Sequence, residues 1–338
     1  MNKYIKLSTL TLSIFISLTL INVSRSSELA EAKITLDDLY QFNDISSIDV
    51  SHSAKQIAYS VSSVDVKKDR YRNDIWLLDV TKNKEKIILK GNPYVEKTKF
   101  SPDDKLLGYL APGRGKYSEY QQIWTIGTKY SSKRQITKLK ANINDFEWSP
   151  DGTQMILVVE SKASDKKIKK TDIQTPKPIV IDRYHFKQDG KEFLGNERQH
   201  LHLLDIKTRT TKQLTKGNSN EILPSWSPDS KKIAYVTKTG EMDRTDNYDI
   251  YILDIDSIDN PIQLTTNLGA DSSSSRPQWS PDGKRIAYLH GGDPALLWYA
   301  LQELAVIDVD TKIHSILTKE LDRNASSPQW SHDGQNIY

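Results

Sequence analysis

Short runs of apolar residues, each bounded by polar turns, recur along this chain and predict β-strands. The segments "KRIAYL" (284–289) and "DIYILDI" (249–255) are rich in Ile, Tyr and Leu and are flanked by Asp, Ser or Gly. Runs of this length and composition are too short for helices and typical of strands. Because they return in a fixed order, the pattern predicts a tandem array of similar all-β units.

Each unit carries three signals. An aromatic residue precedes a Ser-Pro-Asp-Gly-like turn, as in "QWSPDGKRIAYL" (278–289); a second strand such as 249–255 follows; a short "QLT"-like strand, as in "IQLTTN" (262–267), closes the unit. Pro, Asp and Gly suit successive positions of such a turn. The turn serine recurs at Ser51, Ser101, Ser149, Ser227, Ser280 and Ser331, at steps of 50, 48, 78, 53 and 51 residues.

Four antiparallel strands in roughly 50 residues match the size of a propeller blade. We therefore expect an all-β fold, an incomplete β-propeller of four-stranded antiparallel blades over residues 46–338, with about five blades plus the start of a sixth. The expected blade starts lie near residues 46, 96, 146, 223, 276 and 327. The aromatic residues before the turns are expected to pack between blades rather than to bind substrate; they are Phe100, Trp148, Trp226, Trp279 and Trp330.

The two ends of the sequence differ from this array. Residues 1–26 combine Lys3 and Lys6, a short apolar core and Ser24 and Ser26, which predicts a signal peptide cleaved near Ser26. The protein is thus expected to be exported, periplasmic or secreted, without a stable membrane anchor. Residues 27–45 form a lead-in segment. The last string, "QWSHDGQNIY", stops partway into a blade; we expect a truncated chain whose unpaired sheet edge makes it marginally stable or prone to aggregation.

The net charge and the cysteine content exclude few classes of function, and the class they argue against is nucleic-acid binding. The formal net charge is +3, and residues 1–26 hold Lys3, Lys6 and Arg25 without an acid, so the remainder is nearly neutral. Nothing in this balance favours a nucleic-acid partner. The chain has no cysteine, which rules out disulfides but does not identify the compartment.

The long step of 78 residues indicates an insertion at about 160–198 in the third unit. Its first half is polar and Lys-rich, as in a solvated loop, and its second half, Ile179 to Phe186, is expected to form a strand. The insertion marks either a functional face or a tolerated surface loop.

Catalytic motifs are missing from the chain. No G-x-S-x-G or HExxH string occurs, and "GNSNE" (217–221) lacks the final Gly. His200 and His202 share a strand face and are expected to be surface histidines rather than metal ligands. The string "DRTDNYD" (243–249) lacks the Gly and the terminal Glu of a calcium loop. We therefore expect no catalytic residue, no cofactor and no metal site in this chain, and the sequence does not identify substrate-binding residues.

Two longer segments resemble the prolyl oligopeptidase family. Residues 34–80 resemble the start of secreted bacterial members of its acylaminoacyl-peptidase and dipeptidyl-peptidase branch. Residues 177–217 resemble the third blade of these enzymes; the matching residues include Arg183, Lys187, Asp189, Gly190 and His200. The resemblance implies a propeller of seven or eight blades followed by an α/β-hydrolase domain that carries the Ser, Asp and His triad. Glu192 and Glu197 do not reproduce the paired-Glu amine anchor of the family's dipeptidyl peptidases.

The function that this resemblance implies is a non-catalytic, substrate-gating propeller domain of an exported serine peptidase. Its expected partners are peptide substrates and a C-terminal α/β-hydrolase domain absent from this chain. The alternative is a non-enzymatic, TolB-like periplasmic propeller that binds protein partners, although only about 20 residues precede the first unit, too few for the α/β domain of TolB-like proteins. A sugar-binding propeller would have only the generic aromatic residues in its support.

Overall fold

The computed structural model describes residues 35–92, 94–129, 132–161, 181, 183–189, 192–241 and 243–338. The chain divides into two compact units. The first comprises Met1–Asp44 with Ser62–Tyr71, and the second comprises Ile45–Val61 with Arg72–Tyr338. In the first unit lie two short 3-10 helices, η1 (Leu36–Gln41) and η2 (Val66–Lys68). The predicted signal peptide, residues 1–26, lies outside the described residues.

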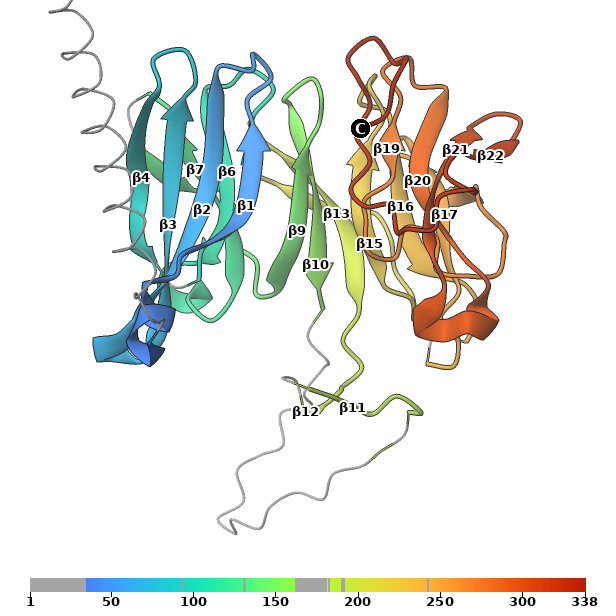
Figure 1. Ribbon diagram of the computed structural model, residues 1–338, viewed down its shortest axis with the longest axis horizontal. Coiled ribbons are helices and arrows are strands. Elements are labelled where there is room, and N and C mark those ends of the chain that lie inside the picture. The colour runs from blue at the N-terminus through green and yellow to red at the C-terminus, as the bar shows by residue number, and fades with distance from the viewer. Residues whose placement is uncertain are drawn as a thin grey trace, which may run out of the picture. The chain divides into compact units, whose positions relative to one another are not determined.

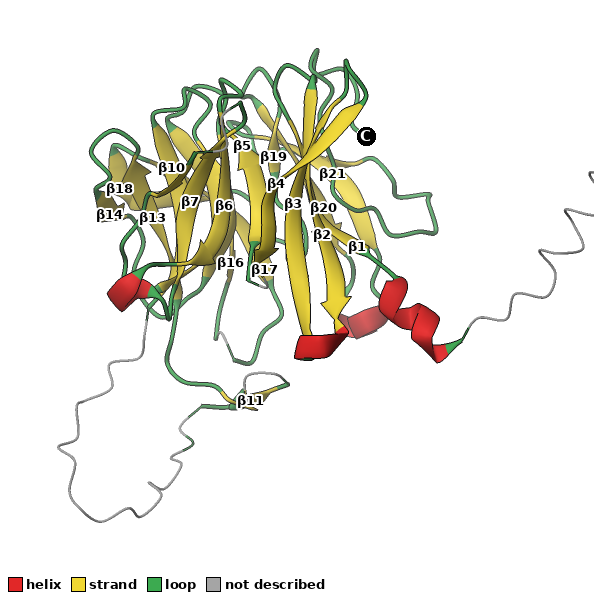
Figure 2. Ribbon diagram, turned by 90° about the vertical axis from the view of Figure 1, so that its left-hand side faces the viewer, coloured by secondary structure: helices red, strands yellow, loops and turns green. Residues whose placement is uncertain are grey.

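Five four-stranded antiparallel sheets make up nearly all of the regular structure (Figures 1 and 2). The first sheet holds β1 (Asp44–Val50), β2 (Gln56–Asp65), β3 (Arg70–Asp79) and β4 (Lys84–Asn92), and the second holds β5 (Glu96–Phe100), β6 (Leu106–Pro112), β7 (Gln121–Gly127) and β8 (Lys133–Gln135). The third holds β9 (Asn142–Trp148), β10 (Gln154–Glu160), β13 (Gln199–Asp205) and β14 (Thr211–Gln213). The fourth holds β15 (Glu221–Trp226), β16 (Lys232–Lys238), β17 (Tyr248–Asp254) and β18 (Ser257–Gln263), and the fifth holds β19 (Gln278–Trp279), β20 (Arg285–Gly291), β21 (Gln302–Asp308) and β22 (His314–Ile316).

In every sheet the strands follow one another in chain order, as in a propeller blade. The third sheet is interrupted between β10 and β13 by a small hairpin of β11 (Lys187–Gln188) and β12 (Glu192–Phe193). Two further 3-10 helices, η3 (Gly115–Tyr117) and η4 (Pro294–Tyr299), lie in the connections β6–β7 and β20–β21. After the fifth sheet, Trp330 and Ile337 form a single antiparallel bridge.

The core consists of apolar layers between neighbouring sheets. One cluster joins Ile75 of the first sheet to Leu107 of the second, and three more join the second to the third, the third to the fourth and the fourth to the fifth. A β-sheet with two apolar faces cannot bury both alone, so it packs against a sheet on each side. The all-β propeller fold predicted from the repeats is confirmed.

The recurring turn owes its geometry to its serine. From the second unit on, the serine hydroxyl donates to the carboxylate of the aspartate two residues later, over 2.5–2.7 Å, and accepts the backbone N–H five residues later. The residue after the aspartate has a positive φ, for example 71° at Gly283. Glycine adopts this conformation without strain.

The tryptophans before the turns tie each sheet to the preceding one, as expected. Their indole N–H groups donate to a backbone carbonyl of the previous unit, and the four pairs are Trp148 to Lys99, Trp226 to Glu147, Trp279 to Ser225 and Trp330 to Gln278, over 2.9–3.3 Å. We call these four hydrogen bonds the indole links. In the second sheet Phe100 occupies this position and has no N–H to donate.

The strand expected over Ile179–Phe186 is wrong for the residues that the structure describes. Arg183, Tyr184 and His185 form a bend, and among the described residues of the insertion the first strand begins at Lys187. A tertiary contact accompanies this bend: the Arg183 side chain is bonded to Asp243, in the connection between β16 and β17.

Candidate functional site

The two ends of the sheets differ in the length of their connections. At one end lie the serine turns and short hairpins. At the other end lie the longer connections β6–β7, β16–β17 and β20–β21 and the described residues between β10 and β13. We call the second the loop end. The hairpin β11–β12 lies beyond the ends of β10 and β13 there (Figure 1).

A cavity of about 650 Å³ opens at the loop end between the third and fourth sheets. We call it the loop-end pocket. The insertion supplies about half of its lining, and the ends of β10, β13, β15, β16 and β17 supply most of the rest; the lining residues are Glu160, Arg183, His185, Gln188, Phe193, Leu194, Gly195, Glu197, Arg198, Gln199, Asn220, Ile222, Lys238, Asp243 and Tyr248. The lining thus combines apolar surface with charges of both signs.

An ion pair holds the insertion onto the fourth sheet. The Arg183 guanidinium donates from Nε to Asp243 over 3.0 Å and from a second nitrogen to the other carboxylate oxygen. It also donates to the carbonyl of Gly195 over 2.6 Å, so that both sides of the β11–β12 hairpin are anchored. The hydrogen bond from Arg183 lowers the pKa of Asp243 below its ordinary value. The pair thus stays charged at neutral pH and fixes one wall of the pocket.

The other two pocket cations are also bonded to the protein. Arg198 donates to the carbonyls of Asn218 and Glu197 over 2.7 and 2.8 Å. Lys238 donates to the carbonyl of Thr245 over 2.7 Å. Both side chains therefore form part of the pocket wall.

His200 is not a surface histidine, contrary to expectation. It is buried, and its Nδ1 lies 2.8 Å from Glu221 on the first strand of the fourth sheet. Burial lowers the pKa of its neighbour His202 to about 4, so His202 is neutral at physiological pH. Gln199 and Asn220, which line the pocket, flank the His200–Glu221 pair, so this pair lies directly beside the pocket.

The acids of "DRTDNYD" are used within the protein. Asp243 binds Arg183, Asp246 lies 3.0 Å from Lys238, and the buried Asp249 accepts from Thr265. Within the described ranges no group of three or more His, Asp or Glu side chains is arranged to hold a metal ion.

The residues that the resemblance singled out are dispersed. Arg183 and Glu197 line the pocket, Lys187 and Asp189 lie in and just after β11, and Gly190 falls outside the described residues. The backbone of Glu192 belongs to β12. Among the members of this set whose side chains the structure describes, Arg183 and Glu197 line the cavity.

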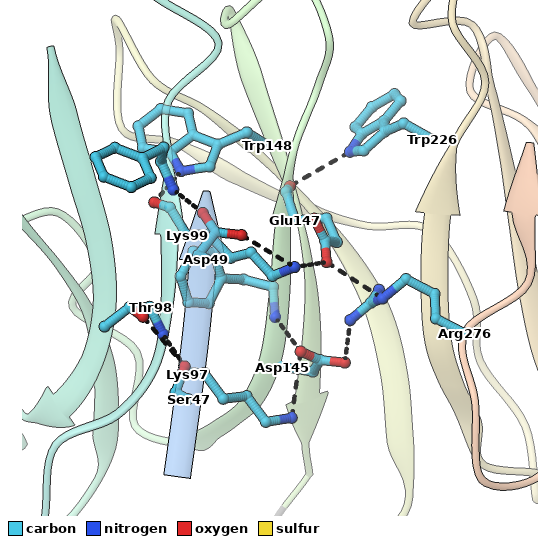
Figure 3. Close-up of polar contacts among 12 residues, drawn as sticks. Ser47, Asp49, Lys97, Thr98, Lys99, Asp145, Glu147, Trp148, Trp226 and Arg276 are labelled. Carbon is cyan, nitrogen blue, oxygen red and sulfur yellow. Dashed lines mark hydrogen bonds and ion pairs between the residues drawn. The ribbon is translucent and has the colours of Figure 1, made fainter. Parts of the chain in front are cut away.

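A second charged group lies on the first strands of the sheets (Figure 3). It alternates in sign; its members are Asp49 of β1, Lys97 and Lys99 of β5, Asp145 and Glu147 of β9, and Arg276 just before β19. We call it the inner-strand charge cluster. Sequence reasoning missed it, although charged residues two apart, such as 97 and 99 or 145 and 147, were a visible signal.

The inner-strand charge cluster also covers an open strand edge. Asp49 accepts the backbone N–H of Phe100 over 2.6 Å, and Ser47 accepts that of Thr98 over 3.2 Å. Unpaired N–H groups at a sheet edge invite further strands. Side chains of β1 thus protect the edge of β5.

No helix within the described stretches is long and apolar enough to cross a membrane.

We compared the chain with known proteins. No protein-family model matches it. An uncharacterized peptidase, YuxL, of Bacillus subtilis is 25% identical over 224 residues, which are 65% of this chain and 34% of the relative. Dipeptidyl-peptidase 5 of Porphyromonas gingivalis is 25% identical over 325 residues, 87% of this chain and 44% of the relative. The chain thus spans between a third and a half of the length of these curated relatives.

Solved structures show the same fold. Acylaminoacyl peptidase of Pyrococcus horikoshii matches with a TM-score of 0.64 at 16% identity, over 86% of this chain and 42% of that protein. The β-propeller domain of the Trilobed protease from Pyrococcus furiosus matches with a TM-score of 0.55 at 16% identity, over 86% of this chain and 75% of that domain. TolB of Agrobacterium tumefaciens matches with a TM-score of 0.53 at 15% identity, over 88% of this chain and 89% of that chain. At such identities these matches establish the fold alone. Together with the two peptidase relatives, they confirm that this chain resembles the propeller part of a prolyl oligopeptidase-family peptidase.

Proposed function

We propose that this chain is the substrate-gating propeller of an exported serine peptidase, in which a C-terminal α/β-hydrolase domain outside the chain cleaves peptides. Two of its relatives are named as peptidases, and the chain spans only 34% and 44% of their lengths. The part of these relatives that lies outside the match is large enough for a catalytic domain. Export through residues 1–26 belongs to the same proposal.

The observation that carries the proposal is the loop-end pocket. It is built by the insertion, lies at the end with the long connections and combines apolar and charged lining. Large apolar side chains are also exposed at this end, including Tyr184, Leu268 and Tyr299. Exposed large apolar side chains favour contact with other proteins or ligands. We assign this end to the catalytic domain and to the peptide that enters between the two domains.

The test compares the chain with the product of the longest reading frame that contains it. The chain alone should not hydrolyse fluorogenic peptides, whereas the longer product should, with loss of activity after a serine-directed reagent. In the longer product, Arg183→Ala should change the ratio of kcat/KM for a long peptide to that for a dipeptide by about tenfold, a change of about 1.4 kcal/mol in transition-state binding. Arg134→Ala, an exposed arginine of β8, is the matched control.

Two results would contradict the proposal. One is inhibitor-sensitive hydrolysis by the chain alone, and the other is a peptide-length preference that Arg183→Ala leaves equal to that of the control. N-terminal sequencing of the secreted product tests cleavage near Ser26 separately, because export and gating can fail independently.

A further inference from the structure

Arg276 forms ion pairs with a sheet that is not the neighbour of its own. Its guanidinium lies 2.8 Å from Asp145 and 3.2 Å from Glu147, both on β9 of the third sheet. Residue 276 itself belongs to the segment that enters β19 of the fifth sheet. The fourth sheet lies between them, since β15 contacts both β9 and β19. Arg276 therefore reaches from the fifth sheet to the third past the first strand of the fourth.

The other contacts between sheets join immediate neighbours. The indole links and the Arg183–Asp243 pair each join one sheet to the next. Such contacts fix each neighbouring pair but let small changes of angle add up along the array. A contact that skips one sheet restrains the sum of two such angles.

Burial makes the Arg276 contact sensitive to loss of either partner. The side chains of Arg276, Asp145 and Glu147 are 16%, 9% and 19% exposed. Burial alone would raise the pKa of Asp145, but Arg276 and Lys97 outweigh it and hold that pKa below its ordinary value. Removing one partner of a buried ion pair leaves an uncompensated charge. The carboxylates of β9 therefore depend on the guanidinium from the fifth sheet.

The series of ion pairs that begins at Arg276 extends past β9 to β5 and β1. Lys99 of β5 lies 3.2 Å from Glu147 and 3.7 Å from Asp49 of β1 (Figure 3). Opposite charges thus follow one another without a break from β1 through β5 and β9 to Arg276. The first, second, third and fifth sheets share one set of ion pairs.

We infer that Arg276 is a brace that holds the fifth sheet to the third across the fourth, and so restrains the sum of the two angles between these three sheets. This inference does not rest on the proposed peptidase function, because it concerns the folded chain alone. Arg276 acts here as a positioning residue.

The test is amide hydrogen exchange of the purified chain, with Arg276→Met as the variant and Arg134→Met as the matched control. Arg134 is an exposed arginine of β8. We expect Arg276→Met to speed exchange by at least about tenfold in β9 and in the segment 272–279 together, and to leave β2–β4 unchanged. Arg276→Lys should give an intermediate effect, because one ammonium cannot serve both carboxylates with the geometry of a guanidinium.

Specific exchange patterns would show that Arg276 is not a brace. If Arg276→Met matches Arg134→Met, or if exchange rises only in 272–279 and not in β9, the brace does not exist. If Arg276→Met fails to fold, the exchange pattern of Arg276→Lys decides by the same criterion. A double variant with Asp145→Asn should add less than the sum of the two single effects, whereas full additivity would contradict direct coupling.

Discussion

Asp271 is a fully buried carboxylate that relies on a histidine near the end of β20. It accepts the backbone N–H of Gly291 over 2.9 Å and the amide of Asn267 over 2.7 Å, and it lies 3.3 Å from Nδ1 of His290. The hydrogen bond to Asp271 raises the pKa of His290 above its ordinary value. Single residues of this kind, rather than the repeat, give each sheet its own electrostatics.

This pair predicts a pH dependence. Because the folded state raises the pKa of His290, protonation of this residue stabilises the fold fully below about pH 6.5, the ordinary value. The contribution is lost as the pH rises through the raised pKa. The urea midpoint of the chain should therefore fall between pH 6 and pH 8.5 more steeply than that of His290→Gln. His332→Gln, which changes an exposed histidine, should keep the slope of the unmodified chain. Equal slopes in all three proteins would contradict the assignment.

At the scale of elements, two devices recur from sheet to sheet. Where the fourth strand leaves the third, a threonine hydroxyl accepts a third-strand N–H; the four threonines are Thr137, Thr215, Thr265 and Thr318. This explains the recurring "QLT"-like string. Where a sheet meets the preceding one, the indole links supply both apolar area and a hydrogen bond.

The indole link of Trp226 combines a hydrogen bond with packing of the buried ring. Two substitutions separate the contributions of these two interactions to the free energy of unfolding. Trp226→Phe keeps the ring but leaves the Glu147 carbonyl without its donor, so unfolding should become easier by about 1 kcal/mol. Trp226→Ala also removes the buried ring and should cost about 3–5 kcal/mol. Urea unfolding followed by circular dichroism measures both. Similar losses for the two variants would show that the hydrogen bond, and not the packing, dominates the contact.

At the scale of the molecule, apolar side chains are exposed at edge strands of the first and fifth sheets. Ile45 and Ile48 of β1 and Leu317 next to β22 are each more than half exposed. Exposed apolar surface on a sheet promotes association.

We therefore expect concentration-dependent self-association of the chain in sedimentation velocity. The double variant Ile48→Lys, Leu317→Lys should shift the chain toward the monomer, because lysine opposes edge-to-edge contact. Lysine at Thr311, an exposed hairpin position, should not have this effect. A chain that stays monomeric at high concentration without any substitution would disprove this expectation.

The sequence alone determined the strands of the repeated units, the serine turns, the packing role of the tryptophans and the propeller fold. These features depend on short segments that repeat, so the same local chemistry acts in every unit. Only the tertiary structure decided that Arg183 meets Asp243, that His200 is buried against Glu221 and that Arg276 reaches Asp145. Each of these contacts joins residues from different sheets or from the connections between their strands, and its existence depends on the angle between sheets, which no local pattern encodes. The loop-end pocket belongs to this second group, because it is a space between sheets rather than a property of any one of them.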